Sequence, residues 1–315
     1  MSMDSHPAKI FAGRSNPQLA REITEYLDLP LGRLVIKNFS DGELWVKFEE
    51  NIRGTDVFLV QSTDTPAENI LELLLMIDAA RRASAHRITA VIPYYGYARQ
   101  DRKDQPRVPI SARLISTLLT EAGADRVLTM DLHSTQIQGF FDIPLDHLYS
   151  KIALLPHLKG KNYDDAVVLA PDVGSIAMAR SYAQLLNASL AIIDKRRPAP
   201  NRSEVMHVIG ELNKKNVLLI DDLVDTAGTM TAAARIAAEK GAESIHAVAA
   251  HAVLSGPAME RIMESPIQRL IVTNTLNIIK DKQFDKLEVI SVGDVFGEAI
   301  KRIHDEESIS SLFNV

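Results

Sequence analysis

The sequence predicts an α/β protein with mostly parallel sheets flanked by helices. Short apolar runs rich in β-branched residues, such as VFLVQ, AVVLA and NVLLI, recur along the chain and suit strands buried on both faces. Helix-period stretches follow several of them, as in ENILELLLMIDAARRA. Residues 56–91 also repeat the order strand, loop, helix, turn and strand of residues 216–250, which indicates duplicated domains rather than a solenoid.

Length and composition fit this organisation. The chain has 315 residues, about twice the usual domain size. The linker FDIPLDHLYS predicts domains of residues 1–147 and 148–315, with the C-terminal tail packing back on the first domain. Hydrophobic residues make up 46% and charged residues 24%, as in ordinary globular proteins. Without cysteine there are no disulfides or thiolate metal sites, which fits a reducing cytoplasm.

Charge and the chain start exclude several partners. A net charge of −6 argues against nucleic-acid or anionic-membrane binding, because those partners need a basic field. The start MSMDSHPAK lacks the apolar core of a signal peptide, and no apolar run approaches the roughly 20 residues of a membrane span. We therefore expect a cytoplasmic protein that captures anions locally.

Three segments of the first half carry candidate chemistry. IKNFSDGELWVKFEE alternates apolar and polar residues around an Asp-Gly pair and predicts a β-hairpin, whose tip could be no more than a turn. Arg99 and Gln100 follow the strand ITAVIPYY, where a guanidinium could bind phosphate or simply face water. Asp131 and His133 lie two apart at a strand end, which predicts that they share one face, although a lone histidine is more often structural.

Two segments of the second half carry more candidate functional residues. IDKRRPAPN places Lys195, Arg196 and Arg197 after a strand; adjacent cations are usually solvated, but on a mobile loop they can close over transferring phosphoryl groups. In VLLIDDLVDTAGT the strand 217–220 runs into a loop and then a helix N-terminus, an arrangement that attracts anions.

The aspartates in that loop either cap the helix or bind part of a ligand. Asp221, Asp222 and Asp225 would repel a bare phosphate, but the conflict resolves if the ligand is a sugar phosphate. Backbone N–H groups of residues 225–229 would then hold the phosphate, while carboxylates accept hydrogen bonds from ribose hydroxyls. In the first copy of the repeat, Gln61 and Ser62 replace the two leading aspartates, so only the second copy is expected to be competent.

DDLVDTAGT closely resembles the phosphoribosyl-diphosphate (PRPP) loop of type I phosphoribosyltransferases and of ribose-phosphate pyrophosphokinases. The pyrophosphokinases are favoured, because stretches similar to theirs occur in the same order along essentially the whole chain: KIFAGRSNPQLA, FSDGE, NIRGTD, PYYGYARQDR, DLHSTQIQGFFDIP, IDKRRP and EESISSLF. The resemblance implies two phosphoribosyltransferase-like domains. It also implies transfer of the diphosphoryl group of MgATP to the C1 hydroxyl of ribose 5-phosphate, giving PRPP and AMP for nucleotide, histidine and tryptophan biosynthesis.

The resemblance further implies roles for individual residues. A flexible catalytic loop carries Lys195 and Arg197. The Mg²⁺ site uses His133 and Asp172. ATP is bound by Arg99 and Gln100 and by a hairpin from a neighbouring subunit of a homo-oligomer, a hexamer in this family, through Phe39, Asp41, Gly42 and Glu43. Ribose 5-phosphate is bound by Arg197, Asp221, Asp222, Asp225, Thr226, Ala227, Gly228 and Thr229.

The sequence also leads to expectations about regulation and about two alternative functions. The resemblance implies a site for phosphate, an activator, and ADP, an inhibitor, at Arg53, Ser308, Ser310 and Ser311. The nearby loop DRKDQPRVP departs from the family pattern, which predicts a weakened or altered response to phosphate. One rival is a phosphoribosyltransferase, which would consume PRPP; the other is a catalytically silent regulatory homologue, which should have lost charges that this chain keeps.

Overall fold

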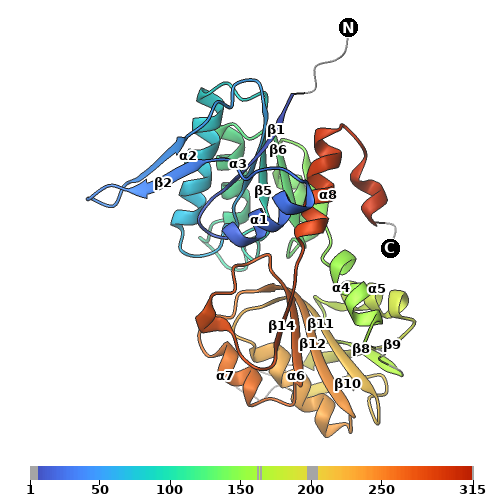
Figure 1. Ribbon diagram of the computed structural model, residues 1–315. Coiled ribbons are helices and arrows are strands. Elements are labelled where there is room, and N and C mark those ends of the chain that lie inside the picture. Colours follow the sequence, from blue (N-terminus) through green and yellow to red (C-terminus); the bar gives the residue numbers. More distant parts are fainter. Residues whose placement is uncertain (1–5, 162, 164, 197–204, 314–315) are drawn as a thin grey trace. The chain divides into compact units, whose positions relative to one another are not determined.

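The computed structural model describes residues 6–161, 163, 165–196 and 205–313 (Figure 1). It divides into two compact units. Unit 1 contains the chain up to Tyr149 together with Thr275–Asn277 and Val292–Asn314, and unit 2 contains Ser150–Asn274 and Ile278–Ser291. Both units are α/β, so the predicted fold class is confirmed. Among the helices of the described residues, none combines the length and apolar character needed to cross a lipid bilayer.

Unit 1 is built on a five-stranded parallel sheet. Its central strands are continuous apolar runs, and all five residues of DVFLV are buried, as expected for a strand covered on both faces. The strand order is β1 (Ala8–Ala12), β4 (Asp56–Val60), β5 (Arg87–Ile92), β6 (Arg126–Met130) and β7 (Leu145–Leu148). The flanking helices are α1 (Pro17–Tyr26), α2 (Glu68–Arg82), α3 (Ser111–Ala122) and the 3₁₀ helix η1 (Thr135–Phe140).

Unit 2 has a seven-stranded sheet that is parallel except for one edge strand. Its order is β10 (Val205–Ile209), β9 (Ser189–Arg196), β8 (Ala166–Ala170), β11 (Asn216–Val224), β12 (Ser244–Ala252), β13 (Arg269–Thr273) and β14 (Leu287–Ile290). Among the strands that the structure describes in this sheet, only the β9–β10 pair is antiparallel. The helices of unit 2 are α4 (Lys151–Lys159), α5 (Ile176–Leu186), α6 (Gly228–Glu239), α7 (Ala258–Met263) and the 3₁₀ helix η2 (Lys280–Lys282).

The predicted repeat extends to whole units. The order β1, α1, a strand pair, β4, α2, β5, α3, β6, η1, β7 recurs as β8, α5, a strand pair, β11, α6, β12, α7, β13, η2, β14. The strand pairs are β2–β3 in unit 1 and β9–β10 in unit 2. The predicted hairpin with FSDGE and the predicted cationic segment with Lys195 therefore occupy equivalent positions in the two copies.

Each copy ends with a helix. The helix after β7 is α4, which belongs to unit 2, whereas the helix after β14 is α8 (Gly293–His304), which belongs to unit 1. In unit 1, α8 packs on α1: Tyr26 donates a hydrogen bond to Glu298 at 2.9 Å, and Gly297 leaves room for the Tyr26 ring. The chain then runs into the 3₁₀ helix η3 (Ile309–Phe313).

The hairpin predicted around the Asp-Gly pair is confirmed. Strands β2 (Leu34–Asn38) and β3 (Leu44–Phe48) pair antiparallel, with Asn38 opposite Leu44. Gly42 adopts a φ of 97°, a left-handed conformation that favours glycine. The hairpin, blue in Figure 1, projects from the body of unit 1.

Candidate active site

The end of strand β11 and the loop that follows it, residues 221–229, form a feature that we call the cradle of unit 2; it begins where β11 stops pairing with β8. Strand β11 pairs with β8 only as far as Leu219 but pairs with β12 to Val224. The sequence predicted a strand ending at Ile220, and this was wrong because the long β12 continues to offer partners. Asp221 and Asp222 therefore lie on a strand at the carboxyl edge of the sheet, where open α/β sheets bind ligands.

The loop itself is residues 225–227, and α6 begins at Gly228. The N-cap residue is Ala227, in the left-handed conformation with φ 60°. Its methyl group cannot accept a hydrogen bond, so the interpretation in which Asp and Thr merely cap this helix fails at the N-cap position. The amides of the first helical turn instead point to a place that an anion can occupy.

Two residues that the sequence analysis missed brace this loop from the segment after β12. Ser255 Oγ donates to the Asp225 carboxylate, and the Ser255 amide donates to the Asp225 carbonyl oxygen at 3.0 Å. Arg261 of α7 donates from Nη1 to the Thr226 carbonyl oxygen at 3.0 Å. A signal was available, since LSGPAMER directly follows the strand next to the cradle.

Asp221 is the most perturbed group of the cradle. Burial, reinforced by the nearby carboxylates of Asp222 and Asp172, raises its pKa to about 8. The Asp222 amide also donates to Asp221 Oδ1 at 3.0 Å. Such an acidic cluster is relieved by hydrogen-bond donors or by a cation, and ribose hydroxyls are donors.

Asp172 lies in the turn between β8 and α5. Its Oδ1 accepts from the amides of Gly174 at 2.9 Å and Ser175 at 3.2 Å, which fixes the carboxylate at the helix start. The described residues contain no group of three or more His, Cys, Asp or Glu side chains that could hold a metal ion. Asp172 could still contribute to a divalent-metal site, because a hard cation such as Mg²⁺ is often held by only one or two carboxylates together with substrate phosphates and water.

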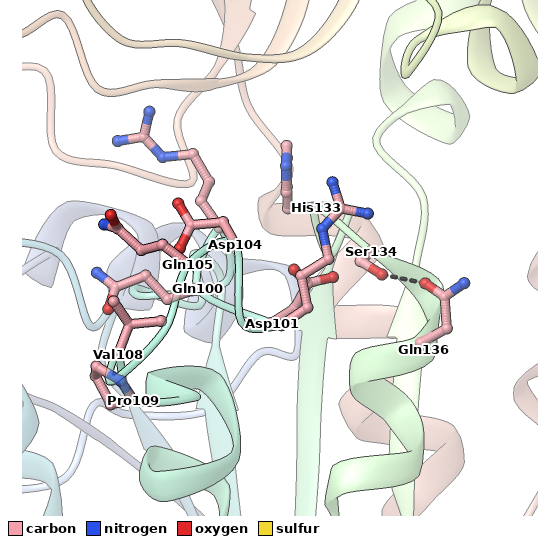
Figure 2. Close-up of a pocket in the computed structure, with 11 residues that line it drawn as sticks. Gln100, Asp101, Asp104, Gln105, Val108, Pro109, His133, Ser134 and Gln136 are labelled. Atoms are coloured by element: carbon pink, nitrogen blue, oxygen red, sulfur yellow. Dashed lines mark hydrogen bonds between the residues drawn. The ribbon is translucent and has the colours of Figure 1, made fainter.

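A cleft of about 580 Å³ opens in unit 1, and Arg99, Gln100 and His133 line it. Figure 2 shows side chains of two segments, residues 99–109 and 133–136, around the cleft. Gln100 also anchors α3, because its Oε1 accepts from Ser111 Oγ at 2.6 Å. The lining includes the basic Arg99 and Arg102 beside two acids, Asp101 and Asp104.

The predicted common face of Asp131 and His133 is wrong. Strand β6 ends at Met130, and Asp131 has a φ of 37°, so the period-two rule does not extend to this pair. Asp131 is 5% exposed, whereas His133 is exposed and lines the cleft. The cleft and the hairpin are separate features, because Phe39, Asp41, Gly42 and Glu43 are not among the described residues that line the cleft.

The remaining predicted residues are distributed as follows. Lys195 lies on β9 opposite Met206, and Arg197 lies outside the described residues. Arg53 is in the turn before β4, where its amide donates to Asn51 Oδ1 at 3.1 Å. Ser308 lies in unit 1 just before η3, and Ser310 and Ser311 lie on η3. Arg302 Nη1 donates to the Ser308 carbonyl oxygen at 3.1 Å.

The two α/β units share one repeated plan, and the loop of unit 2 resembles the PRPP loop in sequence; together these features define a phosphoribosyltransferase-like protein. Comparison with known proteins narrows this class. Residues 8–123 match the N-terminal domain of ribose phosphate pyrophosphokinase, and residues 196–314 match the phosphoribosyl synthetase-associated domain.

Individual relatives agree. Ribose-phosphate pyrophosphokinases of Chlorobaculum tepidum and Bacillus caldolyticus are 56% and 51% identical to the chain, covering 98% and 100% of it and 95% and 100% of the relatives. The crystal structure of phosphoribosylpyrophosphate synthetase from Mycobacterium smegmatis superimposes with a TM-score of 0.89 at 41% identity, covering 95% of this chain and 99% of that one. The chain belongs to the ribose-phosphate pyrophosphokinase family, a family of diphosphate-transferring enzymes.

Proposed function

We propose that the protein transfers the diphosphoryl group of MgATP to the C1 hydroxyl of ribose 5-phosphate, forming PRPP and AMP. The observation that carries this proposal is the cradle of unit 2. It combines a helix start whose N-cap is an alanine with a half-buried pair of carboxyl groups, Asp221 and Asp222, at the same strand end. Amides of residues 225–229 hold the ester phosphate, and Asp221 and Asp222 accept hydrogen bonds from the ribose hydroxyls.

ATP is assigned to the cleft of unit 1. Arg99 contacts the phosphates and Gln100 the nucleotide, in a cleft large enough for a small ligand. Asp101 and Asp104 would repel a bare triphosphate, which favours the less charged magnesium complex as the substrate. When bound, Mg²⁺ neutralises phosphate charge and orients the nucleotide; His133 and Asp172 are the protein groups that would hold it.

The cationic segment supplies transition-state charge. Lys195, with Arg197 beyond the described residues, stabilises negative charge at the β-phosphorus while AMP departs. No covalent enzyme intermediate is needed, because the sugar hydroxyl attacks phosphorus directly once both substrates are held in line. The residues of this chain thus position the two substrates, exclude water from them and neutralise the negative charge of the transferring group.

The adenine is bound by a second copy of the chain. Phe39 is 48% exposed at the tip of a hairpin that projects from unit 1, an arrangement suited to stacking on a base held by a neighbour. This assignment requires a homo-oligomer, and we propose a hexamer. Phosphate and ADP are proposed as effectors at Arg53, Ser308, Ser310 and Ser311.

The reaction is tested by following AMP. Purified protein supplied with MgATP is expected to form AMP and PRPP only when ribose 5-phosphate is added. A parallel reaction with PRPP and a purine base, but without ATP, separates the phosphoribosyltransferases, since only they release pyrophosphate there. AMP formation independent of the sugar would reject the proposal.

A substitution in the cradle tests the assignment of the sugar. Asp222→Asn keeps the size of the side chain but removes its charge, so the hydrogen bonds from ribose hydroxyls become weaker. We expect the KM for ribose 5-phosphate to rise about tenfold, as for loss of a charge-assisted hydrogen bond, with the KM for ATP nearly unchanged. Steady-state kinetics with each substrate varied in turn checks this, and equal effects on both would point to a metal ligand instead.

A further inference from the structure

A buried glutamate in unit 1 is paired with an arginine that reaches the β2–β3 hairpin. The Glu72 side chain is 1% exposed, so its charge requires partners inside the protein. Glu72 Oε1 accepts from the Arg14 amide at 2.6 Å and from Gln61 Nε2 at 3.0 Å. Glu72 Oε2 accepts from Arg14 Nε at 2.5 Å. One edge of the guanidinium is therefore fixed to the body of the unit.

The other edge of the guanidinium contacts the hairpin. Arg14 Nη1 donates to Asn38 Oδ1 at 2.9 Å, and Asn38 Nδ2 donates to the Gly42 carbonyl oxygen at 3.0 Å. A guanidinium can only donate hydrogen bonds. Arg14 therefore fixes the Asn38 amide with its oxygen toward the guanidinium and its nitrogen toward the turn.

The turn of residues 39–43 has further bonds of its own. The Phe39 amide donates to the Glu43 carbonyl oxygen at 2.8 Å, and the Glu43 amide donates to Asp41 Oδ1 at 3.1 Å. These bonds shape the turn but do not connect it to the sheet of unit 1. The series Glu72, Arg14 and Asn38, which we call the hairpin relay, makes such a connection.

The inner end of the hairpin relay occupies the degenerate copy of the cradle. Gln61 aligns with Asp221 in the repeat, and its side chain is fully buried. Besides its bond to Glu72, Gln61 accepts from the Ser15 amide at 3.0 Å through Oε1. The position that we assign to ribose binding in unit 2 thus serves in unit 1 to anchor Arg14 and its loop.

We infer that Arg14 is a positioning residue for ATP, which holds residues 39–43 in the conformation that receives adenine. The inference rests on the proposed function, in which this turn contacts the nucleotide of a neighbouring subunit. Without the hairpin relay the turn samples more conformations, and ATP must order it on binding. This ordering weakens the binding of ATP, but it affects neither the binding of ribose 5-phosphate nor the chemical step.

Two variants test the relay at different links. Arg14→Ala removes the link but leaves the Glu72 charge unpaired, so its folding is checked by thermal melting. Asn38→Asp leaves that pair intact and retains an acceptor for Arg14, but it replaces the donor to the Gly42 carbonyl with an oxygen that cannot donate. Lys47→Ala is the control, because it removes a cation paired with Glu49 from the same hairpin, away from the turn.

The readouts are kinetics and the fluorescence of Trp45, the only tryptophan in the sequence. Lys37 Nζ lies 4.4 Å from the Trp45 ring centroid and 5.8 Å from that of Phe39, so Trp45 senses the turn. For Arg14→Ala and Asn38→Asp we expect the KM for ATP to rise about tenfold. The KM for ribose 5-phosphate and kcat should stay within about twofold. Acrylamide quenching of Trp45 without nucleotide should increase in both variants and stay unchanged in Lys47→Ala.

The two readouts separate the inference from the proposed function. Quenching needs no catalysis, so it tests the relay even if the wild-type protein forms no AMP, an outcome that would count against the proposed function alone. An unchanged KM for ATP in Asn38→Asp, in an enzyme that does form PRPP, would overturn the inference. So would equal rises for both substrates, or quenching that is the same in all variants.

Discussion

Replacing Lys195 by alanine is expected to lower kcat about 10³-fold, the loss seen when a cationic group is removed from a phosphoryl-transfer transition state. Lys195 lies on β9, next to its last residue, Arg196. Strand β9 thus places Lys195 near one end of the unit 2 sheet, in which β9 pairs in parallel with β8, and β8 pairs in parallel with β11, the strand that leads into the cradle. Both substrates are anionic, and the protein carries a net charge of −6. The overall electrostatic field of the protein therefore cannot replace the local positive charge of Lys195.

The measurement is steady-state conversion of ATP to AMP with each substrate varied in turn, which gives kcat and both KM values. Lys240→Ala is the matched control, since it removes an exposed lysine at the end of α6 in the same unit. Substrate KM values are expected to change far less than kcat, because the charge that Lys195 stabilises develops mainly during transfer. Turnover at the wild-type rate would remove Lys195 from the mechanism.

Asp221→Asn is expected to stabilise the protein at alkaline pH while weakening its binding of ribose 5-phosphate. An aspartate in an unfolded chain releases its proton near pH 4, whereas burial holds the pKa of Asp221 at about 8 in the folded protein. Between these values the folded state binds more protons, so this group's contribution to the free energy of unfolding decreases as the pH rises toward 8. Asparagine at this position does not titrate, so its contribution to the free energy of unfolding does not change with pH in this way.

The gain should reach about 5 kcal/mol at pH 9, because the two pKa values differ by about four units, and should vanish below about pH 3, where the carboxyl group is protonated in both states. Urea denaturation of Asp221→Asn and wild type at pH 4.5 and pH 9 measures it, and isothermal titration gives the weaker affinity for the sugar phosphate. Asp165→Asn is the control, because that side chain is 83% exposed near Lys215. A destabilised Asp221→Asn at pH 9 would show that its charge is compensated in the folded protein.

Local sequence predicted the features that short segments determine. DDLVDTAGT specifies the change from strand to helix and the three aspartates within a few residues, and FSDGE contains the turn glycine, so both features follow from local sequence without tertiary contacts. The repeat was visible because it preserves the order of strand, helix and strand. It also predicted that only the second copy is competent, and in the first copy Gln61 is buried and bonded to other residues of unit 1.

Features set by distant contacts were not predictable in this way. The end of β11 depends on pairing with β12, and the backbone of Asp131 departs from the extended conformation just after β6. Ser255 and Arg261 brace a loop about thirty residues earlier in the chain, and Glu72 meets Arg14 across 58 positions. Contacts at such separation are decided by packing, which single-sequence patterns do not encode.

The division of labour in the unit 2 cradle is tested most directly by a crystal structure of the protein soaked with ribose 5-phosphate alone. The ester phosphate should accept hydrogen bonds from the amides of residues 225–229, with the ribose hydroxyls donating to Asp221 and Asp222. A sugar phosphate bound elsewhere, with this loop empty, would contradict the account.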